Sequence, residues 1–262
     1  MKRTPILTFH EPMPEEIIDF AKGARIYDSS CSPEARVYYI EKGEGFYLKR
    51  APAGTLAREA QMCEYFHKKG LGIEMLRYLS LSDCDLMLTV RATGEDCTHA
   101  IYLNDPKRLA VTIAEQLRAL HECDFSDCPV QDRMHEYFAL SEENYRNCNS
   151  DKSHFPDSFG YRSAEDAYAV MTAGKSALSD RVLLHGDYCL PNIILRDWRF
   201  SAFIDLGNGG VGDRHIDLFW GAWTLGFNLG TDAYRDRFLD AYGRDRIDEE
   251  KLRVIAATEV FG

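Results

Sequence analysis

One short stretch in the C-terminal half of the chain constrains its possible folds and functions most. Residues 185–192 read HGDYCLPN and place Asp187 five positions before Asn192. An apolar segment and a turn follow, and a second apolar segment then delivers Asp205 within the sequence FIDLG. Two carboxylates and one amide oxygen are hard donors of the kind that Mg²⁺ prefers. The pattern predicts a loop and a hairpin that present oxygen ligands to a divalent cation.

The same spacing is typical of phosphoryl transfer. Protein kinases carry H-R-D-x-x-x-x-N followed by D-F-G, and this chain carries H-G-D-x-x-x-x-N followed by D-L-G. In that chemistry one carboxylate accepts the proton of the attacking hydroxyl, while the Asn and the second Asp hold the metal ions. H-G-D alone is a common loop tripeptide, and His185 alone reads as a structural hydrogen-bonding residue. The combination of spacing, intervening strand and turn favours phosphoryl transfer.

Composition and cysteine usage indicate a globular protein of one or two domains. The chain has 262 residues, of which 45% are hydrophobic and 28% are charged. No run approaches the ~20 apolar residues of a membrane span, and the N-terminus lacks the apolar region of a signal peptide. We therefore expect a cytoplasmic protein without a membrane partner. The eight cysteines are scattered, so we expect reduced thiols and no zinc site.

The formal net charge of −11 bears on possible partners. An acidic surface disfavours nucleic acid, and we expect no such partner. The charge favours a small cationic substrate by steering it toward the protein, although from the charge alone solubility is the better explanation. The expected oligomeric state is a monomer or a weak dimer.

The N-terminal part reads as a small β-rich lobe. A short helix is expected around residues 17–21, and strands are expected at 37–40, 46–49, 75–79 and 86–90. Lys49 ends the second of these strands, and Glu59 follows ten positions later in a helix predicted for residues 56–69. A strand lysine paired with a helix glutamate fixes nucleotide phosphates in kinase-like folds. The Lys49–Glu59 pair indicates a nucleotide site only when it is considered together with Asp187 and Asp205.

The rest of the chain reads as mostly helical. Helices are expected near residues 105–121, 133–147, 164–178, 216–227, 232–242 and 248–261. We predict a nucleotide-binding N-lobe at residues 1–92 and a catalytic and substrate-binding C-lobe at residues 93–262. Residues 207–212 satisfy G-x-G-x-x-G, but no second strand follows them, which disfavours a dinucleotide site.

With these residues in place, the chain resembles the aminoglycoside phosphotransferases, specifically the 3′-phosphotransferase branch, over nearly its full length. The resembling segments are SPEARVY at 32–38, FYLK at 46–49, LHECDFSDCP at 120–129, IDLG at 204–207, GD at 212–213, IDL at 216–218 and EVFG at 259–262. The resemblance implies an α+β, bilobal, protein-kinase-like fold. In such a fold a five-stranded N-lobe with one helix is joined to a larger, mostly helical C-lobe. ATP or GTP is implied as the phosphoryl donor, and Mg²⁺ as the metal.

The resemblance also assigns roles to individual residues. It implies that Asp187 is the catalytic base, that Asn192 and Asp205 bind Mg²⁺, and that Asp217 braces the catalytic loop. The implied nucleotide-binding residues are Ser32, Tyr47, Lys49, Glu59, Val90 and Ala92, the last two through their backbone. The implied substrate-binding residues are Asp157, Asp187, Glu259 and Phe261.

The substrate side departs from the pattern of that branch. Phe227 and Asn228 stand where acidic residues are expected, and Asn208 replaces an arginine. The leading hypothesis is a kinase that phosphorylates a hydroxyl of an aminoglycoside, with the 3′-hydroxyl as the implied position, and so confers antibiotic resistance. Two alternatives stay open: a kinase of another small amino-alcohol, sugar or antibiotic, and a nucleotide-binding module without catalysis. A protein kinase is disfavoured because no A-P-E motif follows Asp205.

Overall fold

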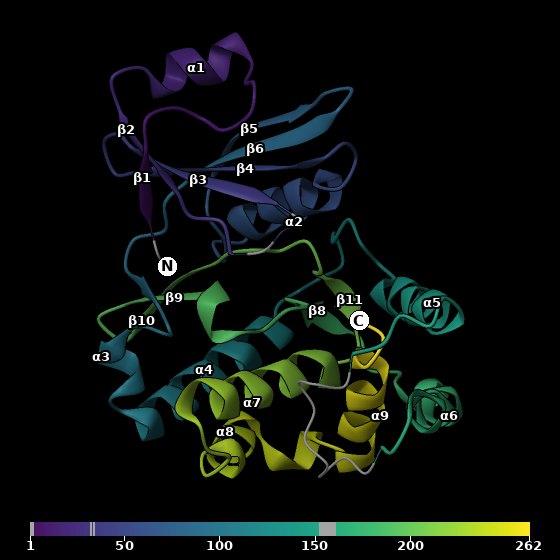
Figure 1. Ribbon diagram of the computed structural model, residues 1–262. Coiled ribbons are helices and arrows are strands. Elements are labelled where there is room, and N and C mark those ends of the chain that lie inside the picture. The colour runs from purple at the N-terminus through teal and green to yellow at the C-terminus, as the bar shows by residue number, and fades with distance from the viewer. Residues whose placement is uncertain (1–2, 32, 34, 152–160) are drawn as a thin grey trace. The chain divides into compact units, whose positions relative to one another are not determined.

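The computed structural model describes residues 3–31, 33, 35–151 and 161–262 (Figure 1). The chain divides into two compact units. Unit 1 comprises residues 1–96 and 191–207, and unit 2 comprises residues 97–190 and 208–262. The predicted α+β class, with a β-rich N-terminal part and a helical C-terminal part, is confirmed. None of the helices in the described ranges combines the length and the hydrophobicity that crossing a bilayer requires.

Unit 1 is built on a six-stranded antiparallel sheet with the order β1-β2-β3-β4-β6-β5. Its strands are β1 (Thr4–Ile6), β2 (Arg25–Asp28), β3 (Arg36–Glu41), β4 (Phe46–Pro52), β5 (Met75–Ser80) and β6 (Cys84–Val90). Its helices are α1 (Glu15–Ala21) and α2 (Ala57–Lys68). The expectation of five strands and one helix is therefore wrong for this chain. The difference arises because the N-terminal segment pairs with β2 as an extra edge strand and is followed by α1.

The two faces of this sheet carry different side chains because successive residues of a strand point to opposite sides. One face is apolar: Tyr38, Ile40 and Leu48 are fully buried beneath Ile17 and Ala21 of α1. On the other face α2 packs, through its own apolar positions, against Ala51 of β4 and Met87 of β6. Figure 1 shows α1 and α2 on opposite sides of the sheet. The α2 face also carries the polar residues Tyr47 and Lys49.

The segment 191–207 forms the hairpin that the sequence predicts, and it belongs to unit 1. Its strands β9 (Ile193–Arg196) and β10 (Arg199–Phe203) pair with each other, and β9 pairs with β7 (Glu95–Asp96). Asp197 and Trp198 have φ angles of 52° and 65°, the left-handed conformation of a tight two-residue turn. The Phe203 amide donates to the carbonyl of Leu71 at 2.8 Å. This bond sets the position of the residues that follow Phe203.

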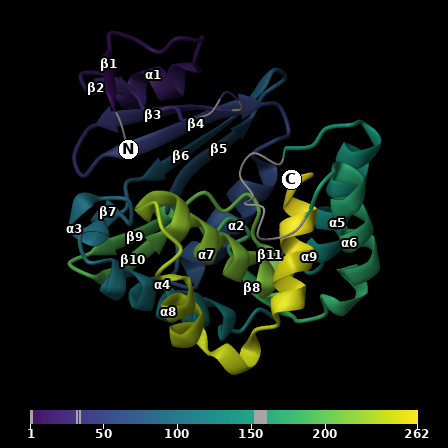
Figure 2. The ribbon, with the colours of Figure 1, turned by 60° about the horizontal axis from the view of Figure 1, so that its bottom comes forward.

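Unit 2 is mostly helical. Its elements are α3 (Ala100–Leu103), α4 (Pro106–His121), α5 (Arg133–Arg146), α6 (Ala164–Gly174), β8 (Val182–Leu184), β11 (Gly210–Gly212), α7 (His215–Leu229), α8 (Arg235–Tyr242) and α9 (Glu249–Glu259). Helix α4 begins where predicted, because Asp105 accepts the amide of Arg108 and Pro106 occupies the first helical position. Helix α9 packs against α6 and α7 (Figure 2). The paired strands β8 and β11 support the loop that begins at His185.

Candidate functional site

A cavity of about 490 Å³ lies on the α2 side of the sheet in unit 1. Seven predicted site residues line it: Tyr47, Lys49, Glu59, Val90, Ala92, Asn192 and Asp205. They come from β4, α2, the end of β6 and the hairpin segment, so residues far apart in the sequence share one cavity. Ser32 lies outside the described residues, and its neighbour Cys31 lines the cavity.

In the cavity lining, the Lys49 ammonium is held between two carboxylates. Its Nζ lies 2.7 Å from Oε2 of Glu59 and 2.8 Å from Oδ1 of Asp205. Burial alone lowers the pKa of Lys49, but the attraction of both carboxylates outweighs it and raises the pKa. Burial, with the repulsion of Asp205, raises the pKa of Glu59 against the opposing effect of Lys49. The two ion pairs thus hold the Lys49 ammonium in place, where it can contact a phosphate group of a ligand.

Asp205 is held in a strained backbone conformation. Its φ is 59°, in the left-handed region that few residues other than glycine adopt, although aspartate and asparagine adopt it more often than most. The strain is maintained by the preceding residues, since the Ile204 amide donates to the Asn192 carbonyl at 3.1 Å. Strain of this kind costs about 1–3 kcal/mol and is concentrated at functional sites. The same hydrogen bond ties Asn192 to the segment that carries Asp205.

Tyr47 and the linker after β6 also line the cavity. The Val90 amide donates to the carbonyl of Glu74 at 3.0 Å, so this amide is already engaged within the protein. Gly94 has a φ of 116°, and a Cβ there would lie 2.2 Å from the Leu195 carbonyl oxygen. Only glycine lets the linker approach the hairpin this closely.

Asp187 lies in a loop of unit 2 that Asp217 braces, as expected. One oxygen of the Asp217 carboxylate accepts the His185 amide and the other accepts the Gly186 amide, each at 2.8 Å. The first oxygen also lies 3.2 Å from Nε2 of the buried His121. The ring of His185 is itself buried and accepts the Asp187 amide at 3.3 Å. These contacts support the structural interpretation of His185.

Gly186 is the residue on which the shape of this loop depends most. Its φ is 83°, and a Cβ would lie 1.9 Å from the carbonyl oxygen of Asn208. We predict that Gly186→Ala lowers the free energy of unfolding by about 3 kcal/mol or more and displaces Asp187. Gly230→Ala is the matched control, because Gly230 has a φ of 65° with nothing within 4 Å, and it should cost about 1–2 kcal/mol. Denaturant unfolding measures both, and equal losses would contradict the predicted clash.

A second group of polar side chains in unit 2 surrounds Glu259 at the end of α9. Its Oε1 accepts the Tyr137 hydroxyl at 2.6 Å and the Trp220 indole N–H at 3.2 Å. Burial, assisted by the repulsion of Asp187, raises the pKa of Glu259 to about 7 against these two hydrogen bonds. Both donors are neutral, so the carboxylate, when ionised, has a charge that a cationic group can neutralise.

The other predicted substrate-binding residues differ in what the structure shows. Asp157 lies outside the described residues. Phe261 is buried, with its ring edge-to-face against Tyr145 and Tyr168. Its carbonyl accepts the Asn144 side-chain amide at 2.8 Å. The Phe261 ring therefore anchors the C-terminal tail to the helices that carry Tyr145 and Tyr168.

Sequence reasoning missed the residues that hold Glu259. Tyr137 precedes it by 122 positions and Trp220 by 39, so no motif connects the three residues. A tyrosine and a tryptophan in amphipathic helices are read as core residues unless their hydrogen-bond partner is known. No signal in the sequence pointed to them.

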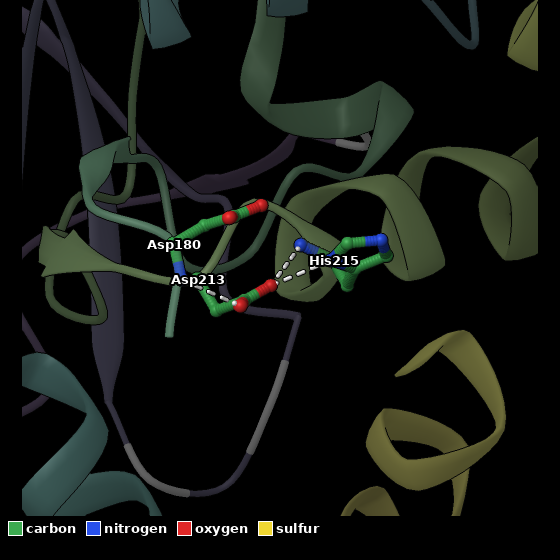
Figure 3. Close-up of side chains that lie close together, drawn as sticks. All are labelled: Asp180, Asp213 and His215. Carbon is green, nitrogen blue, oxygen red and sulfur yellow. Dashed lines mark hydrogen bonds and ion pairs between the residues drawn. The ribbon is translucent and has the colours of Figure 1, made fainter. Parts of the chain in front are cut away.

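Asp180, Asp213 and His215 form the one group of His, Cys, Asp and Glu side chains, in the described part of the chain, with ligand atoms within 4.8 Å of one another (Figure 3). Their hydrogen bonds oppose a metal site. His215 uses Nδ1 toward Asp213 at 2.6 Å, and its Nε2 accepts the Asp248 amide at 3.0 Å. Arg214 already pairs with Asp180 at 2.7 Å. The group is a structural junction between α7, α9 and the start of β8.

Comparison with known proteins identifies the family. Residues 33–255 match the phosphotransferase enzyme family. The chain is 52% identical, over 252 residues and 96% of each chain, to a probable aminoglycoside 3′-phosphotransferase of Lactococcus lactis subsp. lactis (strain IL1403).

Solved structures show the same fold. An aminoglycoside-3′-phosphotransferase of type VIII is 22% identical and superposes with a TM-score of 0.79, covering 92% of this chain and 94% of its own. The Streptomyces rimosus enzyme APH(3″)-Id, solved with ADP and streptomycin, is 23% identical with a TM-score of 0.69, covering 87% and 91%. The resemblance and the kinase-like fold predicted from the sequence are thereby confirmed. The chain belongs to the phosphotransferase enzyme family.

Proposed function

We propose that this protein transfers the γ-phosphoryl group of ATP or GTP to the 3′-hydroxyl of an aminoglycoside and thereby confers resistance to it. The observation that carries the proposal is the Lys49 ammonium, fixed between Glu59 and Asp205 in a cavity of nucleotide size. The 3′-phosphotransferase relative that shares half of its residues supports the choice of acceptor. If the proposal holds, the cavity of unit 1 binds the nucleotide that donates the phosphoryl group.

The residues of the cavity fit a nucleotide with its metal. Tyr47 offers a ring on which a purine can stack, and Lys49 offers a cation to the phosphates. Asn192 and Asp205 both line the cavity and provide the oxygen donors that Mg²⁺ prefers, so the donor set fits that ion. When bound, Mg²⁺ would neutralise charge on the phosphate oxygens. Of the two carboxylate oxygens of Asp205, one (Oδ1) already pairs with the Lys49 ammonium.

Asp187 is the proposed base on the acceptor side. Its carboxylate would accept the proton of the acceptor hydroxyl as that oxygen bonds to the γ-phosphorus. The bond between this phosphorus and the β–γ bridging oxygen breaks at the same time, and the nucleoside diphosphate leaves with the electron pair. The braced amides of residues 185 and 186 keep the loop in one conformation while this occurs.

Glu259 is the proposed partner of an acceptor ammonium. Because its pKa is raised to about 7, the carboxylate is only partly ionised at neutral pH. We predict that kcat/KM for a cationic acceptor rises as the pH increases from about 6 to 8, and that Glu259→Gln flattens this rise. The glutamine keeps the hydrogen bonds of Tyr137 and Trp220 but does not titrate. A rise of equal size in the variant would contradict the role.

The same raised pKa predicts the pH dependence of stability. The folded state binds the Glu259 proton more tightly than the unfolded state does, so stability is lost as the carboxylate ionises. The thermal midpoint of the wild type should therefore fall, relative to that of Glu259→Gln, between about pH 4.5 and pH 7. Parallel midpoints across this range would contradict it.

A second acceptor class is favoured by one observation on α7. Phe227 is 68% exposed and stacks on Trp223 with a centroid distance of 4.9 Å. An exposed aromatic residue, where an acidic one was expected, is suited to a less cationic acceptor such as another amino-alcohol or sugar. Such an acceptor requires no change in the nucleotide site.

The proposal is tested by nucleoside diphosphate release with Mg²⁺ and a panel of acceptors: kanamycin, neomycin, streptomycin, glucosamine and choline. Turnover that depends on kanamycin or neomycin is expected. Turnover only with glucosamine or choline would replace the aminoglycoside by the second acceptor class. Nucleotide binding without turnover for any acceptor would contradict catalysis and favour a non-catalytic module.

A further inference from the structure

Arg3, just before the edge strand β1, reaches the nucleotide cavity of unit 1. Its guanidinium carbon lies 3.5 Å from the ring centroid of Tyr39 and 5.7 Å from that of Tyr47. Its Nη2 donates to the Tyr47 hydroxyl at 2.8 Å, and the residue is part of the cavity lining. The extra strand therefore brings a cation onto the face where a nucleotide base is expected to stack.

Arg3 differs from the other cations of the cavity lining in its partners. Lys49 contacts two carboxylates, and Arg91 lies 3.5 Å from a carboxylate oxygen of Glu95. Arg3 has no carboxylate within 4.0 Å among the residues that the structure describes, and its hydrogen-bond partner is the neutral Tyr47 hydroxyl. Against the opposing effect of burial, the charge of Glu95 acts on Arg3 only from a longer distance and helps to raise the pKa of Arg3. The guanidinium has five N–H donors, so those that Tyr47 does not use can donate to oxygen acceptors of a ligand in this cavity.

The register of the sheet indicates which part of a nucleotide Arg3 would meet. Tyr39 of β3, Tyr47 of β4 and Thr89 of β6 are register partners, so they form one row across the strands. The linker that would meet the base edge follows β6, at one end of this row. A purine stacked on Tyr47 with its edge toward the linker has its sugar on the other side, toward Tyr39 and Arg3.

We propose that Arg3 is a nucleotide-binding residue whose N–H groups donate to oxygen acceptors of the sugar–phosphate part of the nucleotide. The guanidinium stacks on the ring of Tyr39, and its hydrogen bond to the Tyr47 hydroxyl fixes its orientation. The inference rests on the proposed nucleotide site and adds to it a residue from outside the resembling segments. An arginine suits this role because its planar group can stack and donate several hydrogen bonds together.

The test compares the affinities of ADP, adenosine and adenine for the wild type and for Arg3→Ala. Titration calorimetry serves for ADP, and ligand-observed NMR for the two weaker ligands. We expect Arg3→Ala to weaken ADP and adenosine about tenfold and to leave adenine unchanged, as the loss of one charge-assisted hydrogen bond would. A loss for ADP alone would place the contact at the phosphates, within the proposal. An equal loss for adenine, or no loss for any ligand, would overturn it.

Arg25→Ala is the matched control. Arg25 lies on the neighbouring strand β2, is exposed, pairs with Glu41 and is not part of the cavity lining. Its variant should bind all three ligands like the wild type. In steady-state kinetics Arg3→Ala should raise KM for the nucleotide about tenfold with kcat and the acceptor KM unchanged, and a fall in kcat alone would count against the proposal. If the wild type itself binds neither ADP nor GDP, the proposed function fails and not this inference alone.

Discussion

Replacing Asp187 by asparagine is expected to lower kcat by about 10²–10⁴-fold, the usual contribution of a general base. Asparagine has the size of aspartate but does not accept the proton of the acceptor hydroxyl. The affinity for nucleotide should stay within about twofold of the wild type, because all the described residues that line the nucleotide cavity belong to unit 1. The measurement is acceptor-dependent release of nucleoside diphosphate, together with a nucleotide titration.

The control for this variant is Asp240→Asn. Asp240 is an exposed residue of α8 that pairs with Arg244, and its loss should leave turnover unchanged. Full activity of Asp187→Asn would show that another group accepts the proton. A collapse of nucleotide affinity in the same variant would show that the substitution damages more than the base.

The second large effect is expected for Asp205→Asn, with kcat reduced by about 10²–10³-fold at saturating nucleotide. The variant removes a carboxylate from the proposed Mg²⁺ site and one of the two ion-pair partners of Lys49. Asparagine tolerates the left-handed backbone of residue 205 well, so the variant should fold normally. The concentration of Mg²⁺ at half-maximal activity should also rise.

Asp197→Asn provides the matched control for Asp205→Asn. Asp197 lies in the turn of the same hairpin, also has a positive φ, and is not part of the cavity lining. The control should keep the turnover and the Mg²⁺ dependence of the wild type. An unchanged Mg²⁺ requirement in Asp205→Asn would contradict the assignment of this residue as a metal ligand.

The parts of the site that are local in sequence were predictable. Asn192 and Asp205 lie thirteen positions apart and both line the cavity of unit 1, because the hairpin between them is fixed by its apolar strands and its turn. The pair of Lys49 and Glu59 is separated by ten residues, a distance that a strand and the following helix span in a regular way. In these cases the spacing of the residues in the sequence is enough to predict that their side chains lie close together.

The parts that depend on long-range contacts were not predictable. Arg3 meets Tyr47 only because β1 joins the sheet as an edge strand, and a three-residue strand has too few residues to show a period. The engagement of the Val90 amide by Glu74 depends on where β5 begins relative to β6. The buried position of Phe261 depends on the packing of α5 and α6 around the tail. None of these contacts leaves a mark in the local residue pattern.

The most direct measurement compares kanamycin B with tobramycin, which differs from it by lacking the 3′-hydroxyl. Both acceptors carry ammonium groups on the same ring system, so only the proposed point of phosphorylation changes. We predict nucleoside diphosphate release and a phosphorylated product with kanamycin B, and release at the background rate with tobramycin. Equal turnover of both compounds, or of neither, would contradict phosphoryl transfer to the 3′-hydroxyl of an aminoglycoside.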